Sequence, residues 1–289
     1  MNAIQIKNIT KRYKDVTALD DVSFSFEFGK IYGFLGRNGA GKSTLINIIA
    51  NRIFADQGEV LIDGIPAKEN MGVHEKIFCM SEADLYDRDL KVKDHFKWTN
   101  RFYNDFDLDK AFELSQKFNL DTNKRFKALS KGYQSIFKLI IALSLNVPYV
   151  IFDEPVLGLD ANHRELFYSL LLKEFENNER TLIIATHLIE EVSNIIEEVV
   201  LIDKGKILVQ ETVEELLEKG YSVSGAAQEV DRYCVGRNVI GYDELGGLKV
   251  AYVLGEKTVL PQESNLQITA MNLQKLFVKM TEKGGGEND

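Results

Sequence analysis

The stretch that decides the fold of this chain is Gly36-Arg37-Asn38-Gly39-Ala40-Gly41-Lys42-Ser43-Thr44. It has the form G-x-x-x-x-G-K-[ST], which is typical of a phosphate-binding loop. Its glycines allow the backbone to turn tightly, so that successive N–H groups point toward a bound phosphate. In such a loop Lys42 reaches the β- and γ-phosphates, and the hydroxyl of Ser43 ligates Mg²⁺. The motif therefore predicts a site for a nucleoside triphosphate with Mg²⁺.

The sequence on either side of this loop fits the same interpretation. The apolar run Lys30–Leu35 precedes the loop and predicts a buried parallel strand. The segment Leu45–Ile53 follows it, with apolar residues at helical spacing. A strand, a glycine-rich turn and a helix whose N-terminus faces an anion are the setting that the motif requires. The alternative interpretation, a glycine turn that binds no ligand, is disfavoured by this context.

The composition is that of an ordinary globular protein, with 45% apolar and 27% charged residues in a chain of 289. The formal net charge of −9 disfavours broad attraction to nucleic acid or to anionic lipid. The N-terminal residues lack the apolar core of a signal peptide, and no run of about 18 apolar residues is present. Cys79 and Cys234 lack the spacing of a metal site, which fits a reducing compartment. We therefore expect a cytoplasmic protein.

Strand and helix patterns alternate along the first 220 residues. The predicted strands are Ile4–Ile9, Val22–Phe28, Lys30–Leu35, Val60–Ile62, Tyr149–Phe152, Leu182–Ala185 and Val199–Ile202. Helical stretches separate the later strands, and this alternation indicates an α/β fold with a parallel sheet that is covered by helices.

The segment from Val92 to Leu145 has a helical pattern and is rich in aromatic residues, among them Phe96, Trp98 and Phe102. Aromatic residues at i, i+3 and i+4 spacing indicate a helical core rather than a base-stacking surface.

The C-terminal residues 221–289 have a different sequence pattern, with glycine-rich turns such as Gly246-Gly247. A short helix from Val213 to Leu217 is predicted to precede them. Two strands are predicted near Val239 and Val250, and an amphipathic helix is predicted from Leu273 to Met280. The last residues, 284–289, predict a disordered tail.

Two carboxylates, Asp153 and Glu154, end the apolar strand that begins at Tyr149. A phosphate-loop enzyme needs a carboxylate at a strand end to hold Mg²⁺, and Asp153 suits that role. Glu154 is then able to orient or deprotonate the attacking water. The alternative is a solvated acidic turn, which the upstream loop disfavours.

A second candidate anion site follows Leu129, where Ser130-Lys131-Gly132-Tyr133 precedes a helical run. A small hydroxyl and a glycine at a helix N-terminus are suited to binding a phosphate. One chain rarely needs two such sites for one phosphate group, so the residues alone leave the purpose of this segment open.

The chain resembles the ATPase subunit of ATP-binding cassette (ABC) transporters over residues 1 to about 220. The resemblance rests on six motifs in the expected order. They are GRNGAGKST as Walker A, YVIFDE as Walker B, LSKGY as the signature, Val156–Asp160 as the D-loop, Ala185–His187 as the switch histidine, and Tyr13 as the adenine-stacking aromatic. The implied fold is a P-loop NTPase parallel-sheet core with an antiparallel β subdomain and a helical subdomain, plus a small C-terminal α+β domain.

The resemblance implies a head-to-tail dimer in which two ATP molecules are sandwiched between the chains. The partner would be a second copy of this chain or a paralogous ATPase. Ser130 and Gly132 would contact a γ-phosphate that is bound by the partner's Gly36–Thr44 loop. Both halves of a site occur in this chain, so a homodimer could build two complete sites; a heterodimer stays open.

The resemblance also implies roles for single residues outside the loops. His187 would bond the γ-phosphate and help Glu154 to position the water, and Lys42 would complete the catalytic set. Tyr13 would stack on adenine, and Asp160 of the D-loop would join the nucleotide site. Taken alone, His187 and Tyr13 would each have a structural role as an alternative.

Three segments depart from the family pattern. Glu82 stands where the family has its Q-loop glutamine, so a metal contact by its carboxylate survives while an amide donor is lost. Lys131 and Tyr133 alter the signature, and Ser135-Ile136 replaces a frequent Gln-Arg pair.

We therefore expect an ATPase domain at 1–220, with a helical subdomain at about 84–145, and a small accessory or dimerisation domain at 221–283. The expected function is to hydrolyse ATP on the inner face of the cell membrane and to drive a transmembrane permease subunit, with no nucleic-acid partner. The LSKG signature and the ending LQKLFVKM resemble Gram-positive ABC-2-type exporters of drugs and peptides. The alternatives are a soluble ABC-type ATPase that acts in assembly or regulation, and a nucleotide sensor without turnover.

Overall fold

The computed structural model of the chain describes residues 3–81, 83, 85–257 and 265–283. The predicted metal ligand Glu82 and the predicted disordered tail 284–289 lie outside the described residues.

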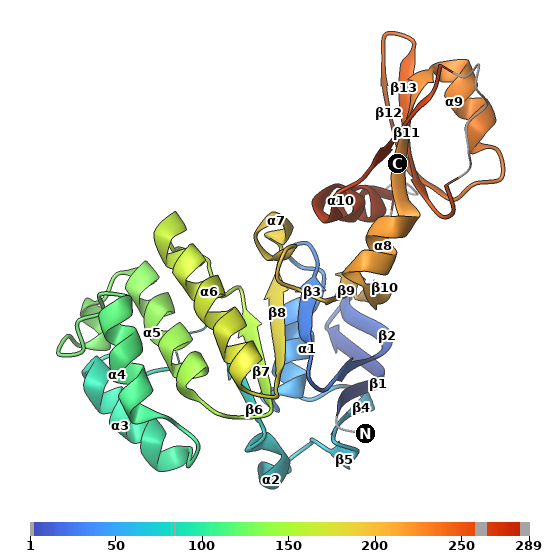
Figure 1. Cartoon of the computed structure of the whole chain (residues 1–289). Helices are drawn as coiled ribbons and strands as arrows, with labels where there is room; N and C mark the ends of the chain where they lie inside the picture. The colour runs from blue at the N-terminus through green and yellow to red at the C-terminus, as the bar shows by residue number, and fades with distance from the viewer. Residues whose placement is uncertain (1–2, 82, 84, 258–264, 284–289) are drawn as a thin grey trace.

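A six-stranded sheet in the order β10-β9-β3-β8-β7-β6 forms the centre of the molecule (Figure 1). Its strands are β3 (Ile31–Leu35), β6 (Ile77–Met80), β7 (Tyr149–Asp153), β8 (Thr181–Thr186), β9 (Glu198–Asp203) and β10 (Lys206–Thr212). All neighbouring pairs are parallel except β9 and β10, which form an antiparallel hairpin at one edge. The predicted parallel sheet is therefore confirmed.

Both faces of this sheet are covered. Every residue of β3, β7 and β8 is buried, which explains why these strands are continuous apolar runs rather than alternating ones. In β3 the side chains of Tyr32 and Phe34 belong to one hydrophobic cluster, whereas Ile31 and Leu35 belong to another on the opposite face.

The first face of the central sheet packs against a four-stranded antiparallel sheet and one helix. The strands are β1 (Ala3–Tyr13), β2 (Val16–Glu27), β4 (Gln57–Ile62) and β5 (Ile65–Pro66), in the order β2-β1-β4-β5. The helix α1 (Lys42–Ile49) follows the phosphate-binding loop, and its residues Leu45, Ile46 and Ile49 enter the same cluster. Ile53, which the sequence pattern includes in this helix, lies beyond its end. A short helix, α2 (Met71–His74), leads into β6.

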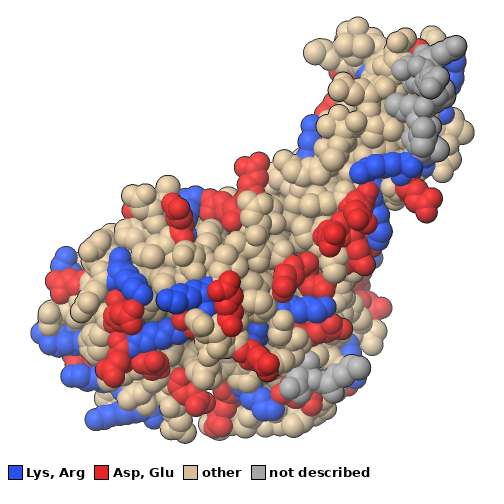
Figure 2. All heavy atoms as spheres, in the orientation of Figure 1, with Lys and Arg blue, Asp and Glu red and all other residues tan. Residues whose placement is uncertain are grey.

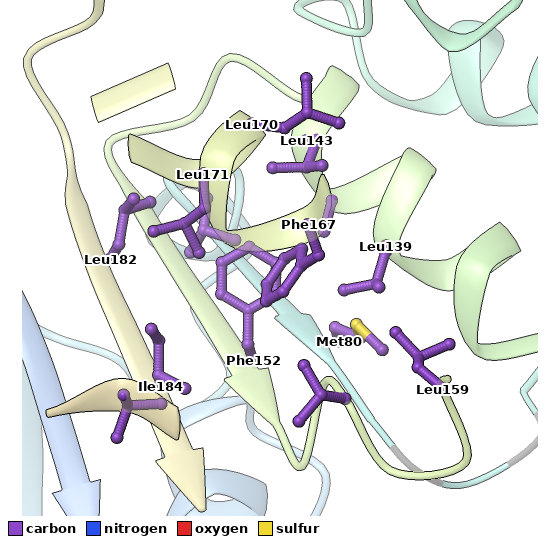
Figure 3. Close-up of a cluster of buried hydrophobic side chains, with 14 of the residues drawn as sticks. Met80, Leu139, Leu143, Phe152, Leu159, Phe167, Leu170, Leu171, Leu182 and Ile184 are labelled. Atoms are coloured by element: carbon purple, nitrogen blue, oxygen red, sulfur yellow. The ribbon is translucent and has the colours of Figure 1, made fainter. Parts of the chain in front are cut away.

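Helices cover the second face and extend beyond it. They are α3 (Val92–Phe102), α4 (Leu108–Lys117), the 3₁₀ turn η1 (Phe126–Ala128), α5 (Lys131–Ser144), α6 (Ala161–Asn177) and the short α7 (Ile189–Val192). Figure 3 shows how α5 and α6 meet the sheet: Phe152 of β7 and Phe167 of α6 lie together, with Leu139 and Leu143 of α5 beside them. The two phenyl rings form an edge contact with centroids 5.5 Å apart.

The prediction that the aromatic residues of the helical segment are core is wrong for two of them. Phe96 is fully buried, but Trp98 and Phe102 are 45% and 77% exposed. These two residues are four positions apart, so they share a face of α3, and that face is turned toward solvent. Their rings stack with centroids 6.1 Å apart, and Arg101 lies over the Trp98 ring.

A third sheet follows α8 (Val213–Lys219) and lies beyond the end of the central sheet in Figure 1. Its strands are β11 (Gly220–Ala226), β12 (Val239–Leu245), β13 (Leu248–Leu254) and β14 (Gln267–Ala270), antiparallel in the order β12-β13-β11-β14. The helix α9 (Ala227–Cys234) packs on β11 and β13, and α10 (Leu273–Lys283) contacts β12, α7 and α8. Sequence patterns predict only β12, β13 and α10, because β11 is rich in glycine and serine and β14 is short.

None of the helices within the described ranges is long and apolar enough to cross a bilayer. On the face shown in Figure 2, acidic and basic side chains are mixed over the body of the molecule.

We expect Phe167→Ala to lower the free energy of unfolding by about 3–5 kcal/mol, because it removes a fully buried ring from the contact between α6 and β7. The matched control is Phe102→Ala, whose ring is exposed and whose loss changes stability by about 0.5 kcal/mol or less. Chemical denaturation monitored by circular dichroism measures both; equal losses for the two variants would contradict the packing described here.

Candidate active site

The phosphate-binding loop joins β3 to α1 at the carboxyl end of the central sheet. Gly41 adopts a left-handed conformation with φ +113°, and a Cβ added there would lie 2.7 Å from the carbonyl oxygen of Ala18 in β2. A Cβ on Gly36 would lie 2.6 Å from the carbonyl oxygen of Ile202 in β9. The loop is therefore folded directly against two strands, and only glycine fits at these positions.

The tip of the loop is open to solvent, while its base is tied down. Arg37, Asn38 and Gly39 are exposed. The amide of Ala40 donates to the Arg37 carbonyl (3.1 Å), and the carbonyl of Ala40 accepts from the amide of Gly205 in the β9–β10 turn (2.9 Å). Thr44 lies in the first turn of α1 and is half-buried.

Lys42 is held inside the loop, with only 5% of its surface exposed. Its ammonium donates to the Gly36 carbonyl at 2.7 Å and lies 3.6 Å from Oε1 of Glu154. Burial lowers the pKa of Lys42, and the carboxylates of Glu154 and Asp153 oppose this shift. The lysine and the glutamate predicted to act together are therefore in contact.

Asp153 ends β7 beside the start of α1. Its Oδ1 accepts a long hydrogen bond, 3.4 Å, from the hydroxyl of Ser43. Because Asp153 pairs with Ala185 in the parallel ladder, β8 fixes its position along the sheet edge. The two predicted metal ligands within the described residues thus lie side by side.

Glu154 has an unusual backbone, with φ +49° at a residue that is not glycine. A left-handed conformation at such a residue costs about 1–3 kcal/mol and is retained only where the surroundings enforce it. Here the Glu154 amide donates to the Ala185 carbonyl at 2.9 Å. The turn directs the carboxylate back over the loop instead of into solvent.

Both oxygens of the Glu154 carboxylate have partners at the end of β8. The Thr186 hydroxyl donates to Oε2 at 2.9 Å, and Nδ1 of His187 bonds Oε1 at 2.9 Å. An ionised carboxylate only accepts hydrogen bonds, so Nδ1 of His187 carries the proton in this arrangement. Thr186 is absent from the residues predicted to form the site, although its hydroxyl after an apolar strand inside the Ala185–His187 motif is a signal for it.

The signature segment begins α5. Ser130 is the N-cap of this helix, and its hydroxyl accepts from the Tyr133 amide at 3.3 Å. A Cβ on Gly132 would lie 2.8 Å from the carbonyl oxygen of Gly158, so α5 packs directly on the D-loop. Throughout the part of the chain that the structure describes, no hydrogen bond or ion pair joins Ser130 or Gly132 to the loop Gly36–Thr44.

Asp160 is the N-cap of α6 and accepts from both the amide and Nδ1 of His163, at 2.9 Å each. The hydrogen bond from the His163 amide is the largest cause of the lowered pKa of Asp160. Arg164 of the same helix donates to the Leu159 carbonyl and pairs with Glu191 of α7. The D-loop is thus anchored through α6 to the helix that follows His187.

Tyr13 ends β1 opposite Val16 and is 47% exposed. Its ring lies under the ammonium of Lys11, with 5.6 Å between Nζ and the ring centroid. Tyr13 belongs to the same hairpin as Ala18, which touches the phosphate-binding loop, but no hydrogen bond within the described ranges joins Tyr13 to the loop.

Comparisons with known proteins all point to one protein family. The family model for ABC transporters matches residues 19–157. The ABC transporter ATP-binding protein NatA of Bacillus subtilis is 30% identical over 74% of this chain and 92% of its own length. The petrobactin import ATP-binding protein YclP of B. subtilis is 26% identical (81% and 98% covered), and the Nod factor export ATP-binding protein I of Sinorhizobium fredii is 27% identical (75% and 65% covered).

A solved structure, the dimeric post-hydrolysis state of the ATP-binding cassette MJ0796 bound to ADP and Pi, superposes with a TM-score of 0.66. It is 25% identical, and the match covers 73% of this chain and 98% of that one. The fold and the site described above define an ATP-hydrolysing protein. The chain belongs to the ATP-binding subunits of the ABC transporter family.

We expect Gly41→Ala to weaken ATP binding by at least about tenfold and to destabilise the protein, because a methyl group would strike the Ala18 carbonyl at a left-handed position. Gly64→Ala is the matched control, since Gly64 has φ +79° but nothing within 4 Å of its added Cβ. Equilibrium binding of a fluorescent ATP analogue, together with thermal unfolding, measures both variants. Equal ATP affinities in the two variants would count against a tightly packed loop.

Proposed function

We propose that this chain is the motor of a transporter that exports a peptide, drug or lipid-like substrate through a separate membrane subunit. The observation that supports ATP hydrolysis is the contact of the Glu154 carboxylate oxygen Oε1 with both Lys42 and His187. Such a cluster at the end of a phosphate-binding loop suits in-line attack of water on a γ-phosphate.

Each residue of the cluster has a distinct task in this proposal. Glu154 accepts a proton from the attacking water, or orients it, and Thr186 holds the second carboxylate oxygen. Lys42 neutralises charge on the β- and γ-phosphates, and His187 bonds the γ-phosphate through the ring edge that does not face Glu154. Tyr13 offers its exposed ring to the adenine, while the backbone of the Gly36–Thr44 loop surrounds the phosphates.

The donor set at Ser43 and Asp153 fits Mg²⁺. A hydroxyl and a carboxylate oxygen 3.4 Å apart are oxygen ligands of the kind this ion prefers. Within the described ranges, no group of three or more His, Cys, Asp or Glu residues could hold a metal ion. In a phosphate-loop site Mg²⁺ takes its remaining ligands from substrate phosphates and water. When bound, Mg²⁺ neutralises phosphate charge at this position. The sequence adds Glu82 as a further candidate ligand.

A second chain completes the site in this proposal. Within the described residues, Ser130 and Gly132 have no hydrogen bond to the loop of their own chain, yet they form a capped helix N-terminus suited to a phosphate. A head-to-tail dimer would bring this N-terminus to the ATP of the partner, with Asp160 close to the same interface. The related dimeric cassette bound to ADP and Pi supports such an assembly.

An exposed apolar groove supports a membrane partner. It lies between α2 and α3 and is lined by Met71, Leu85, Trp98 and Phe102, which are 84%, 64%, 45% and 77% exposed. Apolar exposure of this extent marks an interaction surface. We assign to it an amphipathic cytoplasmic segment of the membrane subunit, because Leu85 in the groove is five residues from Met80, which ends β6 opposite Phe152 and thus beside Asp153. The protein would then work on the inner face of the cell membrane.

For the direction of transport, we propose export. One relative is named for Nod factor export and another for petrobactin import. The signature Ser130-Lys131-Gly132 and the C-terminal segment favour an exporter. In this proposal residues 1–220 form the ATPase domain, about 84–145 its helical subdomain, and 221–283 an accessory domain that assists dimerisation. The alternative, a soluble ATPase for assembly or regulation, predicts ATPase activity that no membrane protein stimulates.

We expect Glu154→Gln to bind ATP but to lose hydrolysis by about 10²-fold or more, because the amide cannot accept the proton of the attacking water. The variant should accumulate as a dimer in Mg-ATP, measured by size-exclusion chromatography with light scattering. Lys42→Ala is the control, since it removes the phosphate contact and should stay monomeric. A Glu154→Gln variant that remains monomeric in Mg-ATP would contradict the proposed dimer.

We expect Phe102→Ser combined with Trp98→Ser to leave basal ATPase activity within about twofold, since both side chains are exposed and distant in sequence from the site. Stimulation by the co-expressed membrane subunit, identified from the neighbouring genes, should fall by about tenfold or more as the groove loses its aromatic anchors. Val235→Ser, at an exposed apolar position in the third sheet region, serves as the control. Unchanged stimulation in the double variant would argue against this groove as the docking surface.

A further inference from the structure

Lys138 is a buried lysine that the proposed chemistry does not use. It lies in the middle of α5 and is only 5% exposed. Its ammonium donates to the backbone carbonyl of Ala83 at 3.1 Å, a partner 55 residues away along the chain. The bond therefore links the signature helix to the segment that follows β6.

Packing alone does not call for a lysine at this position. The neighbouring residues of α5, Phe137 and Leu139, are fully buried in the hydrophobic core. A buried ammonium costs free energy unless polar groups compensate for it, a cost that a methionine at this position would avoid. We therefore expect the ammonium of Lys138 to make a polar contact that contributes to the function of the protein.

The segment that Lys138 reaches begins at the edge of the active site. Met80, the last residue of β6, pairs with Phe152 in the parallel ladder, so the chain leaves the sheet beside Asp153 and Glu154. A cavity lies here, and Lys138 lines it together with Ser81, Gln134, Asp153 and Glu154.

An apolar cluster makes the connection between α5 and β6 rigid. Figure 3 shows Met80 and Leu139 in one cluster with Phe152 and Leu159, so β6, α5, β7 and the D-loop pack as a unit. Lys138 precedes Leu139 in α5, and its bond to the Ala83 carbonyl adds a polar link to this apolar contact. Ser130, at the start of the same helix, is eight residues from Lys138, or about 12 Å along the axis.

We propose that Lys138 is a positioning residue for ATP hydrolysis, which holds the segment after β6 in a fixed relation to the signature helix. The inference rests on the dimer of the proposed function, in which the two ends of this link serve different ATP molecules. Ser81 lines the cavity beside Asp153 in the chain's own site, whereas Ser130 completes the site of the partner. Occupation of one site is thereby transmitted through Lys138 to the other.

The test compares Lys138→Met, which keeps the length and loses the donor, with Lys138→Arg, which keeps a cationic donor. Lys117→Met is the matched control, because Lys117 is exposed on α4 and pairs only across its own helix turn with Glu113 at 2.6 Å in the described structure. The full-length chain is assayed for steady-state hydrolysis of Mg-ATP over a range of ATP concentrations, and for thermal unfolding.

The wild-type chain should show a Hill coefficient approaching the two-site limit of about 2. In Lys138→Met we expect kcat to fall by about tenfold and the Hill coefficient to approach about 1, with the concentration for half-maximal rate changed by less than about threefold. The melting temperature is recorded for every variant, so that a loss of stability is distinguished from a loss of coupling between the sites. Lys138→Arg should recover part of both kcat and cooperativity, and Lys117→Met should match the wild type.

A purely structural role would lower the melting temperature without changing the Hill coefficient, and this result would overturn the inference. So would a Lys138→Met variant with wild-type kcat and cooperativity. A wild-type chain with a Hill coefficient of about 1 would overturn the two-site dimer itself, and the inference with it. A cooperative wild type beside an equally cooperative Lys138→Met leaves the dimer standing and removes only the role of Lys138.

Discussion

The parallel pairing of β7 with both β6 and β8 is the constraint on which the rest of the site depends. Parallel strands end at the same edge of a sheet, so the ladder that aligns Asp153 with Ala185 also brings Glu154 to the end of β8. There Thr186 and His187 bind the Glu154 carboxylate, while β3, paired to the other side of β8, ends in the phosphate-binding loop. Residues that are more than 100 positions apart thus meet without any loop having to carry them together.

The electrostatics of the site follow from this placement. Lys42 is buried against apolar strands, where its charge is poorly solvated and interacts strongly with nearby carboxylates. The ammonium lies 3.6 Å from Oε1 of Glu154 and bonds the Gly36 carbonyl. A triphosphate would offer this cation a stronger partner than Glu154, which would leave the carboxylate free to bind water. The left-handed backbone of Glu154 fits this task, since strain of this kind persists where the surroundings fix a side chain for use.

Most of the central fold and the predicted residues at the sheet edge could be inferred from sequence because their signals are local. Each of these signals is contained in a short stretch of sequence: the glycine spacing of the loop, the apolar strand before Asp153, and the histidine after β8. Features that depend on contacts between distant segments gave no such signal. The exposure of Trp98 and Phe102 depends on which face of α3 meets α5, and the bond from Lys138 to Ala83 spans two elements. The strands β11 and β14 were missed because pairing with β13 and β11, not their own composition, defines them.

The position of α5 explains why a nucleotide would act as more than a substrate in the proposed assembly. Gly132 packs on the Gly158 carbonyl and Ser135 bonds the Leu157 carbonyl, so the helix N-terminus is tied to the D-loop instead of to its own phosphate-binding loop. In the proposed dimer, a phosphate bound by one chain would meet this helix end on the other chain. Because ATP would contact both chains, its binding free energy is also association free energy, and hydrolysis removes the group that holds the two surfaces together.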